Sequence, residues 1–155
     1  MTTSTTSQQH SAPVTTHPPT MDTATVRDVM HPGIVSCSGA AGAAEIARIM
    51  ASCRVHSVAV LGLSKDERHT PHIWGIVSDL DVLAATTRPG APATAADLAS
   101  EPVITVRPTM SLKEAAEAMV RHGVHHVVVA DPERHTPVGI LSTLDIAEVL
   151  AREDR

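Results

Sequence analysis

Polar and apolar positions alternate along the chain with two periods, one typical of helices and one typical of strands. Residues 112–120 predict a helix, because apolar side chains recur there at helical spacing. Ser111 and Glu114 form a capping box at its start, and Gly123 is placed to end it in a left-handed conformation. The corresponding helix earlier in the chain has Gly42 and Glu45 at its start but Arg54 at its end, so its end is less well specified.

Short apolar runs, several of them rich in valine, predict the strands. These runs are 34–36, 57–61 and 73–77 in one half of the chain, and 103–105, 126–130 and 137–141 in the other. A further helix is predicted to start at Ser78 and another at Ser142. The predicted order is therefore β-α-β-β-α, twice.

The two halves are copies of one unit. Residues 28–60 align with 97–129 at an offset of 69, and eight pairs of residues are identical there. The pentapeptide ERHTP occurs at 67–71 and again at 133–137. Because a unit of this size buries too little surface alone, we expect the copies to pack against each other about a pseudo-twofold axis.

Composition separates the copies from the rest of the chain. Half of the first 20 residues are Ser or Thr and none is charged, so residues 1–22 are predicted to be a disordered tail. The copies are assigned to 23–86 and 94–152, with a linker at 87–93 that contains proline and glycine.

Charge and composition exclude several classes of function. The net charge is −5, aromatic residues make up 1%, and there is no basic run, which disfavours nucleic-acid binding. No apolar stretch has the length of a membrane span and no secretory signal is present, so we expect a cytoplasmic protein without a membrane partner. No motif of nucleophilic, phosphate-loop or dinucleotide-binding enzymes occurs, and we expect no enzyme activity.

The repeat length, the β-α-β-β-α order and the ending Gly-hydrophobic-hydrophobic-Ser-x-x-Asp resemble the CBS (cystathionine beta-synthase) domain family. The first copy carries the resemblance in VRDVMHPGIVSC, RVHSVAVL and GIVSDLD, and the second in AADLASEPVITV, GVHHVVVAD and GILSTLD. The resemblance implies a mixed α/β fold, with tandem repeats packed about a pseudo-twofold axis. One departure is visible: many members have proline where this chain has Ala59 and Val128.

The Ser-x-x-Asp pairs have two interpretations from the residues themselves. Ser78 with Asp81, and Ser142 with Asp145, can cap a helix and stabilise its start by about 1 kcal/mol. A helix start also attracts phosphate, and an aspartate one turn later can accept hydrogen bonds from ribose hydroxyls. Both interpretations can hold together.

The resemblance implies two clefts that hold an adenosine derivative such as AMP, ATP or S-adenosylmethionine, sensed as a regulatory ligand rather than required as a cofactor. The first cleft is expected to combine Ile34, His56, Ser57, Ser142 and Asp145, and the second Val103, His125, His126, Ser78 and Asp81. The histidines are either water-exposed residues of the cleft rim or phosphate ligands. In the second case nucleotide affinity should rise from pH 8 to pH 6, because imidazole becomes positively charged.

Other possibilities remain beside nucleotide sensing. A zinc site would combine the clustered His122, His125 and His126 with His69-x-x-His72 in the loop of the other copy, but only the repeat brings these elements near one another and we expect no metal. Cys53 and Trp74 are expected to be packed in the core. A disc-like homodimer that regulates an unknown protein target is expected, and the alternative function is a ligand-independent dimerisation or interaction module with empty clefts.

Overall fold

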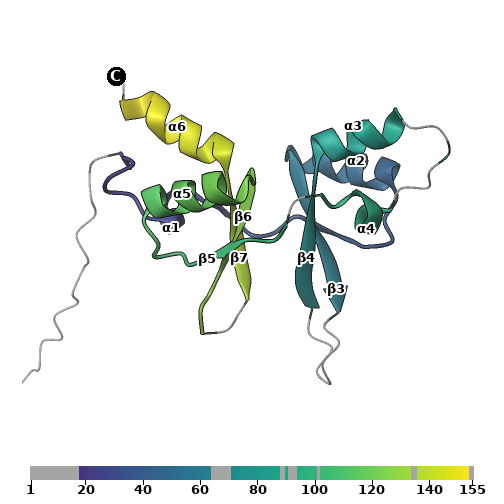
Figure 1. Ribbon diagram of the computed structural model, residues 1–155, viewed down its shortest axis with the longest axis horizontal. Coiled ribbons are helices and arrows are strands. Elements are labelled where there is room, and N and C mark those ends of the chain that lie inside the picture. The colour runs from purple at the N-terminus through teal and green to yellow at the C-terminus, as the bar shows by residue number, and fades with distance from the viewer. Residues whose placement is uncertain are drawn as a thin grey trace, which may run out of the picture.

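Two lobes, each a small sheet covered by helices, make up the structure (Figure 1). It is a computed structural model, and it describes residues 18–63, 71–87, 90, 94–100, 102–133 and 136–153. Residues 1–17, which are most of the predicted tail, lie outside the described residues. Part of each ERHTP segment also lies outside them. The mixed α/β fold is the one expected from the repeat.

The first copy supplies α1 (Val26–Val29), β1 (His31–Pro32), β2 (Ser36–Ser38), α2 (Ala43–Cys53), β3 (Ser57–Leu63), β4 (Pro71–Ser78) and α3 (Asp79–Thr86). The second supplies α4 (Ala95–Leu98), β5 (Thr105–Val106), α5 (Leu112–His122), β6 (His126–Ala130), β7 (Pro137–Ser142) and α6 (Thr143–Glu153). The strands predicted at 34–36 and 103–105 begin two residues later than expected. The reason is that parallel pairing with β3 and β6 starts only at Ser36 and Thr105.

The copies exchange their first segments. One sheet has the order β2-β3-β4, whereas the other has the order β1-β7-β6-β5 and so includes a strand from the first copy. In this sheet β1 pairs antiparallel with β7, with His31 opposite Ile140. Helix α1 packs on α5 and α6, and α4 packs reciprocally on α3 and β4. Each lobe therefore contains the opening segment of the other copy.

The hydrophobic cores show the same exchange. Val26 of α1 is fully buried in the core formed by α5, α6 and the β6–β7 sheet, and Ala95 of α4 is fully buried in the other core. Glycine makes the crossing possible. A Cβ at Gly139 would lie 2.5 Å from the carbonyl oxygen of His31, and a Cβ at Gly75 would lie 2.6 Å from Ala99 Cβ.

The two sheets face each other between the lobes (Figure 1). On β3, Val58 and Val60 belong to the core beneath the helices, so Ala59 points to the opposite face because strand side chains alternate. Ala59 and its neighbour Ile76 are fully buried, and Val128 on β6 is nearly so. The lobes therefore bury one another's inner sheet faces, as the pseudo-twofold packing requires.

Candidate ligand-binding site

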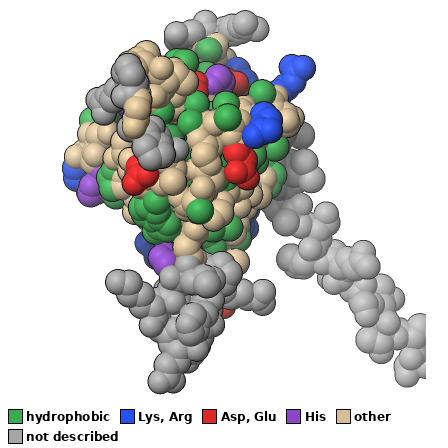
Figure 2. Space-filling view, turned by 90° about the vertical axis from the view of Figure 1, so that its right-hand side faces the viewer, with side chains coloured by type: hydrophobic (Ala, Val, Ile, Leu, Met, Phe, Trp, Pro, Cys, Tyr) green, Lys and Arg blue, Asp and Glu red, His purple; other side chains and the backbone are tan. Residues whose placement is uncertain are grey.

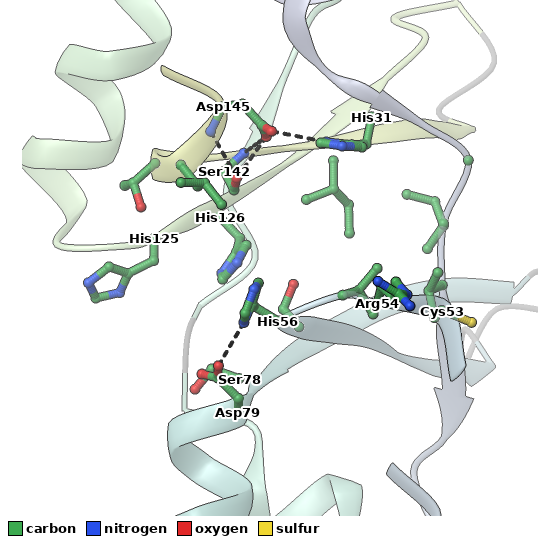
Figure 3. Close-up of a pocket in the computed structure, with 18 of the residues that line it drawn as sticks. His31, Cys53, Arg54, His56, Ser78, Asp79, His125, His126, Ser142 and Asp145 are labelled. Carbon is green, nitrogen blue, oxygen red and sulfur yellow. Dashed lines mark hydrogen bonds and ion pairs between the residues drawn. The ribbon is translucent and has the colours of Figure 1, made fainter. Parts of the chain in front are cut away.

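A cavity of about 930 Å³ lies between the lobes, where strands end and helices begin (Figure 3). One wall is formed by the end of α2 and the starts of β3 and α3. The other is formed by the starts of β6 and α6, and the crossing segment 31–35 runs from this lobe, where β1 pairs with β7, to the first. The volume falls within the range of about 300–1,000 Å³ that is typical of small-molecule sites.

The cavity brings the five residues assigned to the first cleft together. They are Ile34, His56, Ser57, Ser142 and Asp145. Three residues assigned to the second cleft, Ser78, His125 and His126, line the same cavity. The other two, Val103 and Asp81, do not line it. This cavity therefore contains all the residues predicted for the first cleft and only some of those predicted for the second.

Asp145 is held by a dense set of contacts at the first turn of α6. Its Oδ2 accepts hydrogen bonds from the backbone N–H and the hydroxyl of Ser142, both at 2.7 Å, and its own N–H donates to Ser142 Oγ at 3.3 Å. Its Oδ1 lies 3.0 Å from Nδ1 of His31, which comes from β1 of the first copy. The helix-capping interpretation is therefore realised, and the buried carboxylate also contacts the exchanged segment.

Asp81 has a matching set of contacts at the first turn of α3. Its Oδ2 accepts from the N–H of Ser78 at 2.7 Å and from the Ser78 hydroxyl at 2.6 Å. Its Oδ1 accepts from the hydroxyl of Ser100 at 2.6 Å. Ser100 aligns with His31 at the repeat offset of 69, so the exchanged segment contacts the aspartate in both halves.

The histidines differ in their surroundings. His56 Nδ1 lies 2.9 Å from Asp79 Oδ2, and both side chains are exposed. His126 is buried at the start of β6 and pairs in register with Ser142 on β7. In Figure 3 the ring of His125 projects to the outer side of the view, away from the labelled rings of His56 and His126.

Sequence reasoning missed Arg54, His31 and Glu148, all of which line the cavity. The signal for Arg54 was present, because the equivalent residue in the second copy is Gly123. The expectation that Cys53 packs in the core is wrong: its thiol is exposed and lines the cavity, because α2 ends at this residue. Trp74 is 41% exposed and not a core residue, because β3 and β4 are irregularly paired beside it.

Metal ligands and membrane-spanning helices are two further features that bear on function. Within these residues no group of three or more His, Cys, Asp or Glu side chains is arranged to hold a metal ion. His69, part of the metal alternative, lies outside the described residues. Among the described helices, none combines the length and apolarity that a bilayer crossing requires.

The exchanged segments, the two facing sheets and the cavity between them define a pseudo-symmetric tandem α/β module. The CBS domain family model matches residues 26–88 and 95–152, which cover both copies. The chain belongs to the CBS domain family.

Solved structures with the same fold include the CBS domain pair of protein MJ0100 in complex with 5′-methylthioadenosine and S-adenosyl-L-methionine. It is 19% identical with a TM-score of 0.69, and the match covers 84% of this chain and 98% of that one. CBSX2 in complex with AMP is 21% identical with a TM-score of 0.62, over 84% and 98% of the chains. Hypoxic Response Protein I with two coordinated zinc ions is 26% identical with a TM-score of 0.59, over 81% and 98%.

One curated relative also matches, over a short stretch. It is the L-aspartate semialdehyde sulfurtransferase of Methanocaldococcus jannaschii, which is 36% identical over 59 residues. The match spans 38% of this chain and 11% of that protein's length. The shared stretch is thus a small part of that enzyme.

Proposed function

We propose that the chain is a regulatory module that binds an adenosine-containing nucleotide in the cavity between its lobes. The ligand class comprises AMP, ADP, ATP, NAD and S-adenosylmethionine. The observation that supports this proposal most directly is the convergence, in one cavity, of residues that lie more than 80 positions apart, such as His56 and Asp145. The similarity to MJ0100 and CBSX2, whose structures hold adenosine compounds, supports the same ligand class.

Each wall of the cavity has a part in this proposal. Asp145 accepts hydrogen bonds from the ribose hydroxyls, and Ser142 with the first turn of α6 faces a phosphate. Ile34 lies against the base, and the cavity histidines, His56, His125 and His126, are the candidate phosphate ligands carried over from the sequence. Val103 and Asp81 do not line this cavity, so their assignment to a second cleft stays a prediction.

The proposed role is regulatory and not catalytic. A ligand shifts a protein between conformations only when it binds one of them more tightly, so an unidentified protein target would respond to the ligand-bound state. The sulfurtransferase match supports no enzyme activity here, because it covers 11% of that enzyme. We further propose that repeats 23–86 and 94–152, joined by 87–93, act together in the cytoplasm and require no cofactor. We also propose that the chain has no nucleic-acid partner, and the net charge of −5 supports this proposal.

The test is a thermal-shift and calorimetry series with the five compounds and two matched variants. A ligand at 100 times its Kd should stabilise the protein by about 2.7 kcal/mol. Asp145→Ala and Asp81→Ala remove the same type of helix cap, but only Asp145 lines the cavity. We expect Asp145→Ala to weaken binding at least tenfold and Asp81→Ala to leave it nearly unchanged. Equal affinities in both variants would refute the site, and no thermal shift with any compound would refute the function.

A second function, ligand-independent dimerisation, is favoured by large apolar side chains on the surface. Five of them are about half exposed or more: Leu80, Leu83, Val120, Leu144 and Leu150. Figure 2 looks onto the lobe with α2, α3 and α4, where apolar side chains are spread between few charged ones. Sedimentation of the ligand-free chain tests a homodimer, and Leu83→Lys should shift it towards the monomer. A monomeric wild-type protein would rule this function out.

A further inference from the structure

Arg54 ends α2 in a conformation that an arginine rarely adopts. Its φ of 54° and ψ of 47° lie in the left-handed region, and no other non-glycine residue in the described part of the chain has a positive φ. Such conformations cost free energy for residues with a Cβ, and they occur preferentially at functional sites. The observation therefore needs an explanation at this position.

The second copy performs the same helix ending with glycine. Gly123 ends α5 with φ 63° and ψ 34°, and its N–H donates to the carbonyl of Met119, as the N–H of Arg54 does to the carbonyl of Met50. These positions are equivalent at the repeat offset of 69. Because glycine completes the same turn without a Cβ, the fold itself does not require an arginine.

The carboxylates of the cavity already have partners. Asp79 contacts His56, and Asp145 contacts His31 and Ser142. Glu148 lies 3.3 Å from a guanidinium nitrogen of Arg152. Each negative charge on the cavity wall is thus adjacent to a hydrogen-bond or ion-pair partner.

The side chain of Arg54 is different, since its guanidinium makes no hydrogen bond or ion pair within the described residues. It is exposed and lines the cavity, drawn beside Cys53 on the opposite side of Figure 3 from His125. A guanidinium remains charged at every relevant pH and offers a planar set of donors that suits phosphate oxygens. The lining also carries the carboxylates of Asp79, Asp145 and Glu148, so the unpaired guanidinium of Arg54 favours an anionic group of the ligand locally, where that group lies beside it.

We infer that Arg54 binds the anionic group of the ligand, and that the cavity therefore takes a phosphorylated adenosine nucleotide in preference to an uncharged adenosine derivative. The inference rests on the proposed function and narrows its ligand class. Because Gly123 occupies the matching position, the preference belongs to one of the two pseudo-symmetric halves. The alternative to ligand binding is a structural role for Arg54. In that role its positive charge stabilises the C-terminal end of α2, whose last turn carries no basic residue.

The experiment compares wild type with Arg54→Gln, Arg54→Gly and Arg54→Lys, using calorimetry with AMP, adenosine and inorganic pyrophosphate. Arg121→Gln is the matched control, since Arg121 is an exposed arginine near the end of α5 that does not line the cavity. Unfolding temperatures are measured for every variant. Arg54→Gly is the decisive variant, because glycine relieves the left-handed conformation while removing the charge.

We expect wild type and Arg121→Gln to bind AMP at least tenfold more tightly than adenosine. Arg54→Gln and Arg54→Gly should lose at least tenfold in AMP affinity, with adenosine affinity unchanged within twofold. Arg54→Lys should retain part of the affinity, and Arg54→Gly should unfold at the same or a higher temperature than wild type.

Two results overturn the assignment of Arg54 while leaving the proposed function intact. One is AMP affinity that is equal in wild type and Arg54→Gln. The other is adenosine binding as tight as AMP binding in wild type. Pyrophosphate binding that needs Arg54, with no binding of adenosine or of any of the five compounds of the thermal-shift series, would instead refute the proposed function and keep the anion site. A lack of binding by all three compounds would refute the inference, and it would refute the proposed function as well if ADP, ATP, NAD and S-adenosylmethionine also give no thermal shift.

Discussion

Nδ1 of His31 lies 3.0 Å from Oδ1 of Asp145, so a residue from the exchanged segment of the first copy contacts the carboxylate proposed to bind a ribose. The aspartate is buried, whereas His31 is 79% exposed. Since Oδ2 is already engaged by Ser142, Oδ1 is the oxygen that ligand and histidine would share. His31 and the ligand should therefore compete for Asp145.

The first prediction follows from this competition. An ion pair with one exposed partner contributes about 0–1 kcal/mol, so His31→Ala should tighten AMP binding by up to about fivefold and destabilise the fold only slightly. Ser100→Ala is the matched control, because it removes the equivalent contact to Asp81 outside the cavity. Calorimetry on both variants measures the effect. Weaker binding in His31→Ala would show that the imidazole contacts the ligand rather than competes with it.

A second prediction concerns the crossing of the exchanged segments. In Gly139→Ala the new methyl group would lie 2.5 Å from the backbone oxygen of His31 and 3.0 Å from Met30 Sδ. Because the backbone must shift to make room, we expect a loss of roughly 1–3 kcal/mol in the free energy of unfolding. In Gly39→Ala the nearest atoms lie at 3.7 Å, which is ordinary contact, so this control should stay close to wild type. Urea denaturation distinguishes the two, and equal stabilities would contradict the crossing.

Sequence periodicity predicted the order of the elements well because each copy carries its own signals. Val-rich runs and Ser-x-x-Asp caps are local features, and they appear at β3, β6, α3 and α6 as expected. The family resemblance placed Ile34, His56 and Asp145 together, although no local pattern links them.

The exchange of opening segments could not be predicted in this way. Val26 and Ala95 are apolar in either arrangement, and only tertiary packing decides which lobe buries them. The contact between His31 and Asp145 depends on that exchange and spans 114 positions, so no spacing rule could have found it. Arg54 was detectable in principle, since a break in the Gly123 pattern of the repeat marked it.

A third prediction concerns acid stability and Asp28, the N3 residue of α1. Hydrogen bonds from the backbone N–H of Thr25, and then from its hydroxyl, hold the pKa of the Asp28 carboxyl below its ordinary value. A carboxylate with a lowered pKa stabilises the fold above the unfolded-state value of 3.8, and this contribution is lost as the pH falls through the folded-state value. The docking of α1 on the second lobe should therefore weaken in acid.

Asp28→Asn measures this contribution. At pH 7 we expect a loss of less than about 1 kcal/mol, since the side chain is exposed and solvent screens it. The difference from wild type should shrink as the pH drops below 4. Asp22→Asn serves as the control, because Asp22 makes no hydrogen bond or ion pair within the described residues. Chemical denaturation across pH 3–7 gives the comparison, and a difference that is constant with pH would contradict the carboxylate's role.

The last prediction uses the two cysteines as reporters of the cavity. Burial, and secondarily the carboxylate of Glu45, raise the pKa of the Cys37 thiol, so this residue should react slowly with a disulfide reagent at pH 8. Cys53 is exposed and lines the cavity, so it should react first, and Cys53→Ser should remove the fast phase. Saturating AMP should slow the fast phase at least tenfold, because the bound nucleotide covers the end of α2. An unchanged rate under saturating AMP would place the ligand elsewhere on the molecule, since nothing bound beside Arg54 could leave the neighbouring thiol equally accessible.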